Sequence, residues 1–297
     1  MPVKSIDHII VCVRDLEAAT RQYETLLGRS DSLTGPHPDY GTANALINLG
    51  NTYIELLSPT GDGRFSESLR GHLDNKGEGL FGIALGTDDA DATAAELQAK
   101  GLNASAPQSG EGHGHDGSVR RWRNVYLPQE DMLGLFMFAI EHEAASVMTS
   151  LAKPAGPEDA TLHEVDHVVV NVPDGDNAVA LFGDAMGIRL ALDRDAKQWG
   201  ARMMFFRLGG ITLEVIQRYG DDKTPAMPKD APSKYWGMAF RADNVAAAQA
   251  RLADAGVNVS DVRKGRKPGT LVATVRDNSC GVPTLIVGPD PEADDAA

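Results

Sequence analysis

The chain has 297 residues, which is enough for about two domains that each bury a core. Its formal net charge of -14 repels phosphate groups, so we exclude nucleic acid and anionic membranes as partners. We expect a small-molecule substrate, and a homodimer is possible. The two cysteines, Cys12 and Cys280, give no disulfide framework (one long-range bridge stays open), and no segment resembles a signal peptide or membrane span, so we expect a cytoplasmic protein.

The first predicted elements are a strand, a helix and a run of further strands. Residues 6–13 are rich in β-branched side chains and predict a strand. Asp15 is a helix N-cap candidate, and the helix predicted over 16–27 ends at Gly28. Strands are expected at about 43–49 and 52–58. Because helices occur singly among many strands, a mixed α+β fold is favoured over a doubly wound parallel sheet.

The chain then repeats itself at a constant offset of 159 residues. IDHIIVCVRDLEAATRQYETLLG, starting at Ile6, matches VDHVVVNVPDGDNAVALFGDAMG, starting at Val165. A weaker repeat of the same pattern starts at Gly79 in the first half and at Tyr235 in the second, so four modules are expected. We predict an N-terminal domain over 1–145, a linker over 146–162, and a C-terminal domain with a short acidic tail over 163–297.

The repeat brings two residue types to matching positions, a histidine on the first strand and a glutamate on a later one. His8 matches His167, and Glu55 matches Glu214. Side chains alternate across a strand, so all four are expected on the sheet face that does not carry the helix. A curved sheet makes a concave pocket on that face, and histidine and glutamate converging in a pocket predict a metal site.

The stretch HEVDH, residues 163–167, has the spacing of the zinc-protease motif H-E-x-x-H. That motif requires a helix, whereas the following VVVNVP predicts a strand, in which residues four apart are separated by about 13 Å. We therefore reject a zinc-protease site and expect His163 to lie outside any metal shell.

The opening strand pattern [IV]-D-H-[IV]-x-V-x-V, the helix that ends in glycine, GTANALINLGNTYIELLSP and GVPTLIVGP resemble the vicinal oxygen chelate superfamily, and specifically its glyoxalase-like domain proteins, over about residues 5–290. The resemblance implies two tandem glyoxalase-like domains of paired βαβββ modules, with curved mixed sheets around a concave pocket. It also implies a divalent metal ion (Fe, Mn, Ni, Zn or Mg) that the substrate chelates through two neighbouring oxygens. The metal ligands map onto four residues of this chain: His8, Glu55, His167 and Glu214.

The second and fourth modules depart from this pattern. Gly82 and Gly237 stand at the first-strand ligand position, and Met137 or Phe138 and Leu285 stand where glutamate is expected. If neighbouring modules share a site, each site has one histidine and one glutamate. If modules one and three share it, the site has two of each, which is the set found in glyoxalases and epimerases.

The resemblance implies a metal-dependent lyase or isomerase that acts on an α-hydroxycarbonyl-like substrate through an enediolate. Glu55 or Glu214 would serve as the general base. One alternative is an extradiol-type ring-cleaving dioxygenase, although the local signature of those enzymes is missing. The other is a metal-free protein that binds a small molecule or drug.

Two arginines and several histidines carry further signals. Arg121 and Arg123 alternate onto one face of a strand and predict a clamp for a substrate carboxylate or phosphate, with a solvated edge strand as the alternative. His113 and His115 lie in a glycine-rich segment and could supply missing ligands. The remaining histidines have no counterpart in the other half and are expected at the surface: His37, His72, His142 and His163.

Overall fold

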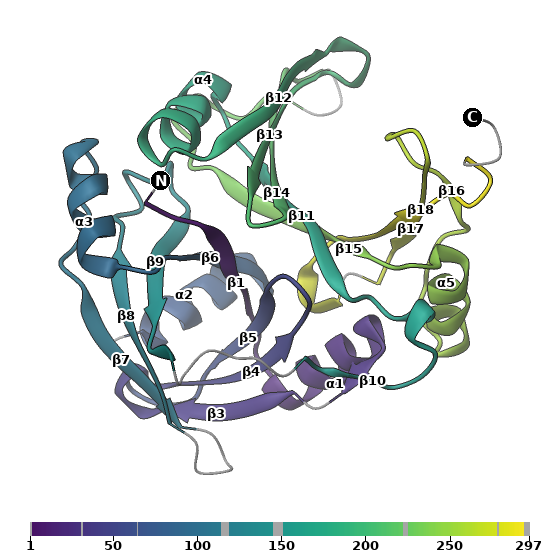
Figure 1. The fold of residues 1–297 in the computed structure, drawn as a ribbon, viewed down its shortest axis with the longest axis horizontal. Coiled ribbons are helices and arrows are strands. Elements are labelled where there is room, and N and C mark those ends of the chain that lie inside the picture. Colours follow the sequence, from purple (N-terminus) through teal and green to yellow (C-terminus); the bar gives the residue numbers. More distant parts are fainter. Residues whose placement is uncertain are drawn as a thin grey trace. The chain divides into compact units, whose positions relative to one another are not determined.

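The computed structural model describes residues 2–30, 32–63, 65–113, 119–144, 151–221, 225–277 and 279–293, and most of its strands belong to two eight-stranded sheets (Figure 1). The first sheet has the order β3-β4-β5-β1-β6-β9-β8-β7. Its strands are β1 (Ser5–Cys12), β3 (Leu33–His37), β4 (Thr42–Asn48), β5 (Tyr53–Pro59), β6 (Gly79–Gly86), β7 (Gln108–His113), β8 (Val119–Tyr126) and β9 (Phe136–His142).

The second sheet repeats this arrangement in the order β12-β13-β14-β11-β15-β18-β17-β16. Its strands are β11 (Glu164–Asn171), β12 (Arg189–Ala196), β13 (Ala201–Leu208), β14 (Ile211–Arg218), β15 (Lys234–Arg241), β16 (Arg263–Lys264), β17 (Thr270–Val275) and β18 (Thr284–Pro289). A small ribbon joins β2 (Arg29–Ser30) to β10 (Lys153–Pro154). Both large sheets are mixed, because β6 with β9 and β11 with β14 run parallel while the hairpin neighbours run antiparallel.

Each group of four sheet strands carries one helix after its first strand. These helices are α1 (Leu16–Leu27), α3 (Ala90–Ala99), α4 (Gly175–Ala178), which continues as a π-helix over Val179–Ala185, and α5 (Val245–Asp254). A further helix, α2 (Ser66–Lys76), follows β5. Short 3-10 turns lie at Pro38–Tyr40, Glu158–Ala160, Lys197–Trp199 and Ser279–Gly281. The element order is therefore βαβββ four times, and the α+β fold predicted from the sequence is confirmed.

Helix α1 shows how local sequence fixes the module. Asp15 Oδ1 accepts a hydrogen bond from Ala18 N, which satisfies an amide that has no partner inside the helix. Gly28 ends the helix with φ of 66°, a left-handed conformation that glycine adopts without steric cost. The side chains between these caps that face the sheet are fully buried, among them Tyr23, Leu26 and Leu27. The predicted helix and both of its caps are confirmed.

The same position in the second half differs in its hydrogen bonding. Asp174 caps α4 by accepting from Asp176 N and Asn177 N, but the helix widens into a π-helix before Gly187. Its residues Leu181 and Phe182 are nonetheless buried against β13, as the apolar repeat predicts.

The chain folds into two compact units, each built from three segments. The first comprises Met1–Ile10, Phe81–Val147 and His167–Trp236, and the second comprises Val11–Leu80, Met148–Asp166 and Gly237–Ala297. The predicted linker over 146–162 begins in residues outside the described part, and the domain boundaries stay a prediction.

Within the second unit, a buried arginine fixes the end of that linker. Arg29 is 4% exposed and donates to Ala152 O, Thr161 Oγ1 and Leu162 O. Burial lowers the pKa of Arg29, because the low-dielectric surroundings disfavour its charged form. Cys12 and Cys280 are buried and unbonded to each other. Within the described residues, no helix has the length and apolar composition needed to span a membrane.

Candidate functional site

Two of the four predicted metal ligands, His167 and Glu214, lie side by side in the second sheet. His167 Nε2 is 3.4 Å from Glu214 Oε2, and the two side chains are 19% and 13% exposed. Strands β11 and β14 are parallel neighbours in which Glu214 lies opposite Val169. Val169 shares a strand face with His167, two residues before it, so the register brings both functional groups to one face.

That face is the one opposite the helix of the module. Gln217, three residues after Glu214 on β14, accepts a hydrogen bond from Gly175 N at the start of α4 through its Oε1 atom. Residues three apart on a strand point to opposite faces, so Glu214 points away from α4. The strand alternation used in the sequence analysis predicts this placement.

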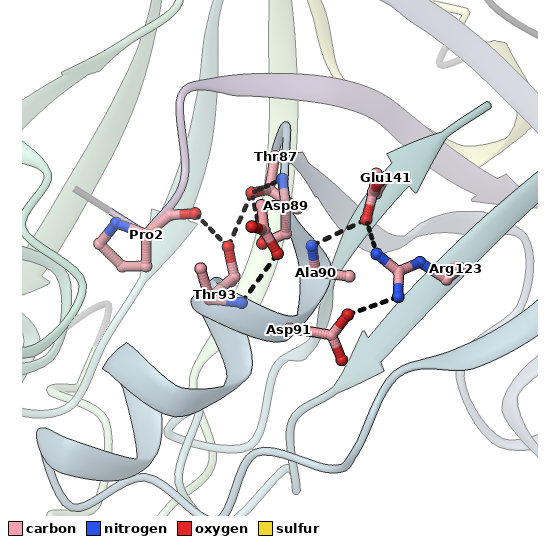
Figure 2. Close-up of polar contacts among 9 residues, drawn as sticks. Pro2, Thr87, Asp89, Ala90, Asp91, Thr93, Arg123 and Glu141 are labelled. Atoms are coloured by element: carbon pink, nitrogen blue, oxygen red, sulfur yellow. Dashed lines mark hydrogen bonds and ion pairs between the residues drawn. The ribbon is translucent and has the colours of Figure 1, made fainter. Parts of the chain in front are cut away.

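In the first sheet, His8 is enclosed by an aspartate and an aromatic ring. His8 Nδ1 lies 2.7 Å from Asp7 Oδ1, and its ring meets Phe138 edge to face at a centroid distance of 5.8 Å. On the same strand as Phe138, Glu141 faces α3, because its carboxylate accepts from Ala90 N (Figure 2). Phe138 and Glu141 are three residues apart and face opposite ways, so His8 lies on the face away from α3, as predicted.

Asp7 also contacts a second histidine that the sequence analysis placed at the surface. The same Oδ1 atom lies 3.1 Å from His142 Nε2, and the His142 side chain is only 12% exposed. Burial acts to raise the pKa of the Asp7 carboxyl, but hydrogen bonds from His142 and His8 outweigh it and hold that pKa well below its usual value. The surface prediction is wrong for His142, and also for His37, which is 8% exposed.

Glu55, in the second unit, is held by an amide. Asn44 Nδ2 donates to Glu55 Oε1 at 2.6 Å, and both residues are less than 10% exposed. Asn44 and Leu46 are two residues apart on β4 and therefore point to the same face. Leu46 lies opposite Glu55 on β5, so the amide and the carboxylate share one face of the hairpin.

The distances test whether these residues suit a divalent ion. Two ligand atoms bound at about 2.0–2.2 Å with tetrahedral or octahedral angles lie about 3.0–3.5 Å apart. The separation of His167 and Glu214 fits two such positions. Among the described residues, however, no group of three or more His, Cys, Asp or Glu side chains is arranged to hold a metal. The four-ligand site that combines His8, Glu55, His167 and Glu214 stays a prediction.

The HEVDH stretch adopts the strand conformation that the sequence analysis expected. Residues 164–167 belong to β11, so His163 and His167 do not share a helical face. His163 Nε2 lies 3.8 Å from Asp243 Oδ1. The strand predicted for this stretch is confirmed.

Within the described part of the chain, His113 joins no group of three or more side chains that could hold a metal. His113, on β7, lies with its Nε2 atom 3.1 Å from Glu111 Oε1, and both side chains are about half exposed. His115 lies outside the described residues.

The predicted arginine clamp lies on the helix face of the first sheet. Arg123 bridges Asp91 in the first turn of α3 at 2.6 Å and Glu141 on β9 at 2.5 Å (Figure 2). Arg121, two residues earlier on β8, has its Nε atom 3.5 Å from Glu111 Oε2. Because alternate residues share a face, both guanidinium groups point away from the face of His8 and Phe138. Their substrate-binding role stays a prediction, and the function proposed below does not depend on it.

A pocket of about 290 Å³ lies elsewhere in the first unit. It is lined by the turn at Leu133, the start of α4 at Asp174 and the loop over 229–233. None of the four predicted metal ligands contributes to its wall.

Family models match most of the chain. A model described as a glyoxalase-like domain matches residues 6–162, and one described as the glyoxalase/bleomycin resistance protein/dioxygenase superfamily matches residues 166–274. Among solved structures, a triple mutant of 4-hydroxymandelate synthase from Streptomyces coelicolor superposes with a TM-score of 0.67, at 16% identity, over 98% of this chain and 94% of that one. At this identity the likeness concerns the fold.

Curated relatives are similar over shorter stretches. Human mitochondrial methylmalonyl-CoA epimerase is 34% identical over 96 residues, which is 32% of this chain and 53% of the relative. The ethylmalonyl-CoA/methylmalonyl-CoA epimerase of Cereibacter sphaeroides is 36% identical over 85 residues, 28% of this chain and 61% of the relative. The chain thus spans little more than half the length of the curated relatives it matches. With its repeated βαβββ modules and the two family matches, the chain belongs to the glyoxalase-like, or vicinal oxygen chelate, superfamily.

Proposed function

We propose that this protein is an enzyme that moves a proton on a carbon next to a carbonyl group, in the manner of an epimerase or glyoxalase-type isomerase. The observation that supports this most directly is the placement of His167 beside Glu214 on the face away from α4. A histidine and a carboxylate at that spacing suit two positions of a divalent ion. The curated relatives, which are named as epimerases of acyl-CoA thioesters, point to the same kind of reaction.

A divalent ion, when bound, would polarise the substrate carbonyl and acidify the adjacent C–H bond. The chain supplies the remaining functions. Glu214 is the base that accepts the proton from carbon, and in an isomerisation its protonated carboxyl is the acid that returns the proton to the neighbouring carbon. In an epimerisation a second acid returns a proton to the opposite face of the same carbon. His167 holds Glu214 at a fixed separation, and the low exposure of both side chains keeps water away from the reacting carbon.

For the substrate, we propose a compound whose acidic carbon lies beside two oxygen-bearing groups that can both bind the divalent ion. Methylmalonyl-CoA fits this chemistry, because its acidic carbon lies between a carboxylate and a thioester carbonyl. It is the natural first probe, and α-hydroxycarbonyl compounds are the second.

The test combines elemental analysis with isotope exchange. Protein purified without a His tag and reconstituted with Mn, Fe, Ni or Zn should hold about one ion per chain, and it should exchange the α-proton of methylmalonyl-CoA or of an α-hydroxycarbonyl compound with deuterium from D2O. Both signals should be lost in His167→Ala. His163→Ala is the matched control, because His163 lies before β11 and contacts Asp243.

Two results would contradict the proposal. Absence of bound metal under every reconstitution, together with binding of a small ligand, would indicate a binding protein. Oxygen consumption with a catechol, without proton exchange, would indicate a ring-cleaving dioxygenase.

A further inference from the structure

Asp7, His8 and His142 form a hydrogen-bonded cluster in the first unit in which one carboxylate oxygen serves two imidazoles. Asp7 Oδ1 lies 2.7 Å from His8 Nδ1 and 3.1 Å from His142 Nε2. The three side chains are 17%, 6% and 12% exposed, respectively. The three residues come from two strands that are far apart in sequence, β1 and β9, so the contact is a product of the tertiary fold.

The hydrogen-bonding capacity of each group fixes where the protons lie. An ionised carboxylate can only accept, so both imidazole nitrogens that face Asp7 Oδ1 must carry protons. In neutral His8 the proton is then on Nδ1, and the lone pair is on Nε2. In neutral His142 the proton is on Nε2, and its Nδ1 atom is a buried acceptor that has no hydrogen-bond partner among the described residues.

We propose that Asp7 and His142 are positioning residues for His8, which fix its Nδ1–H tautomer and present Nε2 as the ligand or acceptor atom of the first half. The inference rests on the proposed function in taking His8 as a site residue. A carboxylate that accepts from the far nitrogen of a metal-binding histidine also increases the basicity of the ligating nitrogen.

Two features separate this role from simple packing. The first is His142 itself, since burying an acceptor without a partner is unfavourable and an apolar side chain would avoid it. What histidine gains at this position is the N–H that it donates to Asp7. The second feature is that the equivalent aspartate of the other half is held differently, because Asp166 Oδ2 accepts from Arg241 Nε at 2.9 Å. An aspartate beside the strand histidine can thus accept from an arginine, whereas Asp7 accepts from a second histidine, His142.

The test is the tautomer of His8 in metal-free protein, read by nitrogen-15 NMR of the imidazoles at a pH where they are neutral. In the unaltered protein we expect His8 to carry its proton on Nδ1. Asp7→Asn should shift the ring to a mixture of tautomers, because an amide can donate to Nδ1 as well as accept from it. His142→Leu should shift it partly, and His142→Gln, which retains an N–H donor, should restore the original signal. Asp166→Asn is the matched control and should leave the His8 signals unchanged.

Metal affinity provides the second measurement. With Zn²⁺ or Mn²⁺ as the probe, Asp7→Asn should bind about 10-fold to 100-fold more weakly than the unaltered protein. A His8 proton found on Nε2, or a tautomer that Asp7→Asn leaves unchanged, would overturn the inference. If His8 shows the expected tautomer and response but the unaltered protein binds neither ion, the positioning role is supported and the metal-dependent function fails. Circular dichroism of each variant establishes that it is folded, and the His142 variants test the inference should Asp7→Asn unfold.

Discussion

The two halves of this protein place the same dipeptide, Asp-His, on the first strand of a sheet, yet they surround it differently. In the first half, Asp7 accepts from His8 and His142. In the second half, Asp166 accepts from Arg241, which also binds Glu164. The aspartate and the histidine thus occupy the same strand positions in both halves, but the side chains that contact the aspartate from neighbouring strands differ.

The substitutions responsible can be read from the strand registers. The position of Arg241 on β15 corresponds to Gly86 on β6, which has no side chain. The position of His142 on β9 corresponds to Pro289 on β18. In the first half the partner of the aspartate is His142, on the last strand of the module, where the second half has Pro289. In the second half the partner is Arg241, on the first strand of the module, where the first half has Gly86.

The glutamates differ in the same way. Asn44 donates to Glu55 at 2.6 Å, whereas the repeat places Met203 at the position of Asn44, and methionine has no N–H to give Glu214. Glu214 lies beside His167. The comparison shows that the amide donor of Glu55 has no counterpart at position 203, and that His167 and Glu214 lie at a separation that suits the proposed chemistry.

The largest expected effect follows from removing the proposed base. Glu214→Gln should lower kcat for proton exchange by about 100-fold or more, which is typical of losing a general base. Glu55→Gln should have a smaller effect, since a glutamine at this position can still accept from Asn44. The measurement is deuterium incorporation under saturating substrate. Equal losses in the two variants would show that both halves contribute a carboxylate to the reaction.

A smaller effect is expected from Asp7 and depends on pH. At pH 7, Asp7→Asn should lower the free energy of unfolding by about 1.5–3 kcal/mol, because hydrogen bonds to a charged acceptor are lost. The pKa of Asp7 is depressed in the folded state by its contacts with His142 and His8, although burial opposes this. Its stabilisation is therefore complete above the unfolded pKa of about 4 and is lost as the pH falls towards the folded pKa.

Urea unfolding between pH 2 and pH 7 checks this expectation. The difference in stability between the unaltered protein and Asp7→Asn should shrink below about pH 4. A difference that stays constant down to pH 2 would mean that Asp7 is not stabilised as a carboxylate.

Next in size is an exchange between the halves at the Asn44 position. Met203→Asn places an amide on β13, the strand next to Glu214, and on the same face of the sheet. The amide should donate a hydrogen bond to the Glu214 carboxylate and make it a weaker base. We expect activity to fall about 10-fold, which corresponds to about 1.4 kcal/mol. Met203 packs with Ala196 and Ala201, so some stability is lost as well. Met203→Leu, which conserves volume and adds no donor, separates packing from hydrogen bonding. Similar activity losses in the two variants would attribute the effect to packing alone.

The sequence predicted those features that depend on local periodicity and on the repeat. Alternation along β1 and β11 placed His8 and His167 on the face away from the helices, and Asp15 and Gly28 marked the ends of α1. It could not predict the contact between Asp7 and His142, because that contact joins residues 135 positions apart and His142 has no counterpart in the other half. Only the packing of β9 in the first sheet determines it.

The predicted arginine clamp is a second case in which the sequence pattern was not sufficient. Alternation correctly put Arg121 and Arg123 on one face of β8, but it does not say which face α3 covers. That assignment depends on where α3 docks, and there Arg123 meets Asp91 and Glu141.

The smallest expected effect concerns Arg123 and sharpens the difference between the two faces of the first sheet. Arg123→Ala breaks two ion pairs, but its side chain is 38% exposed and Asp91 is 70% exposed, so solvent screens much of the attraction. We expect a loss of at most about 1 kcal/mol in the free energy of unfolding, with KM unchanged. Glu141 would still accept from Ala90 N and hold the start of α3. Thermal unfolding and steady-state kinetics on the same sample provide the measurement, with Arg120→Ala, on the opposite face of the strand, as the control. An increase in KM without a change in stability would instead support the substrate-binding role that the sequence predicted for this arginine.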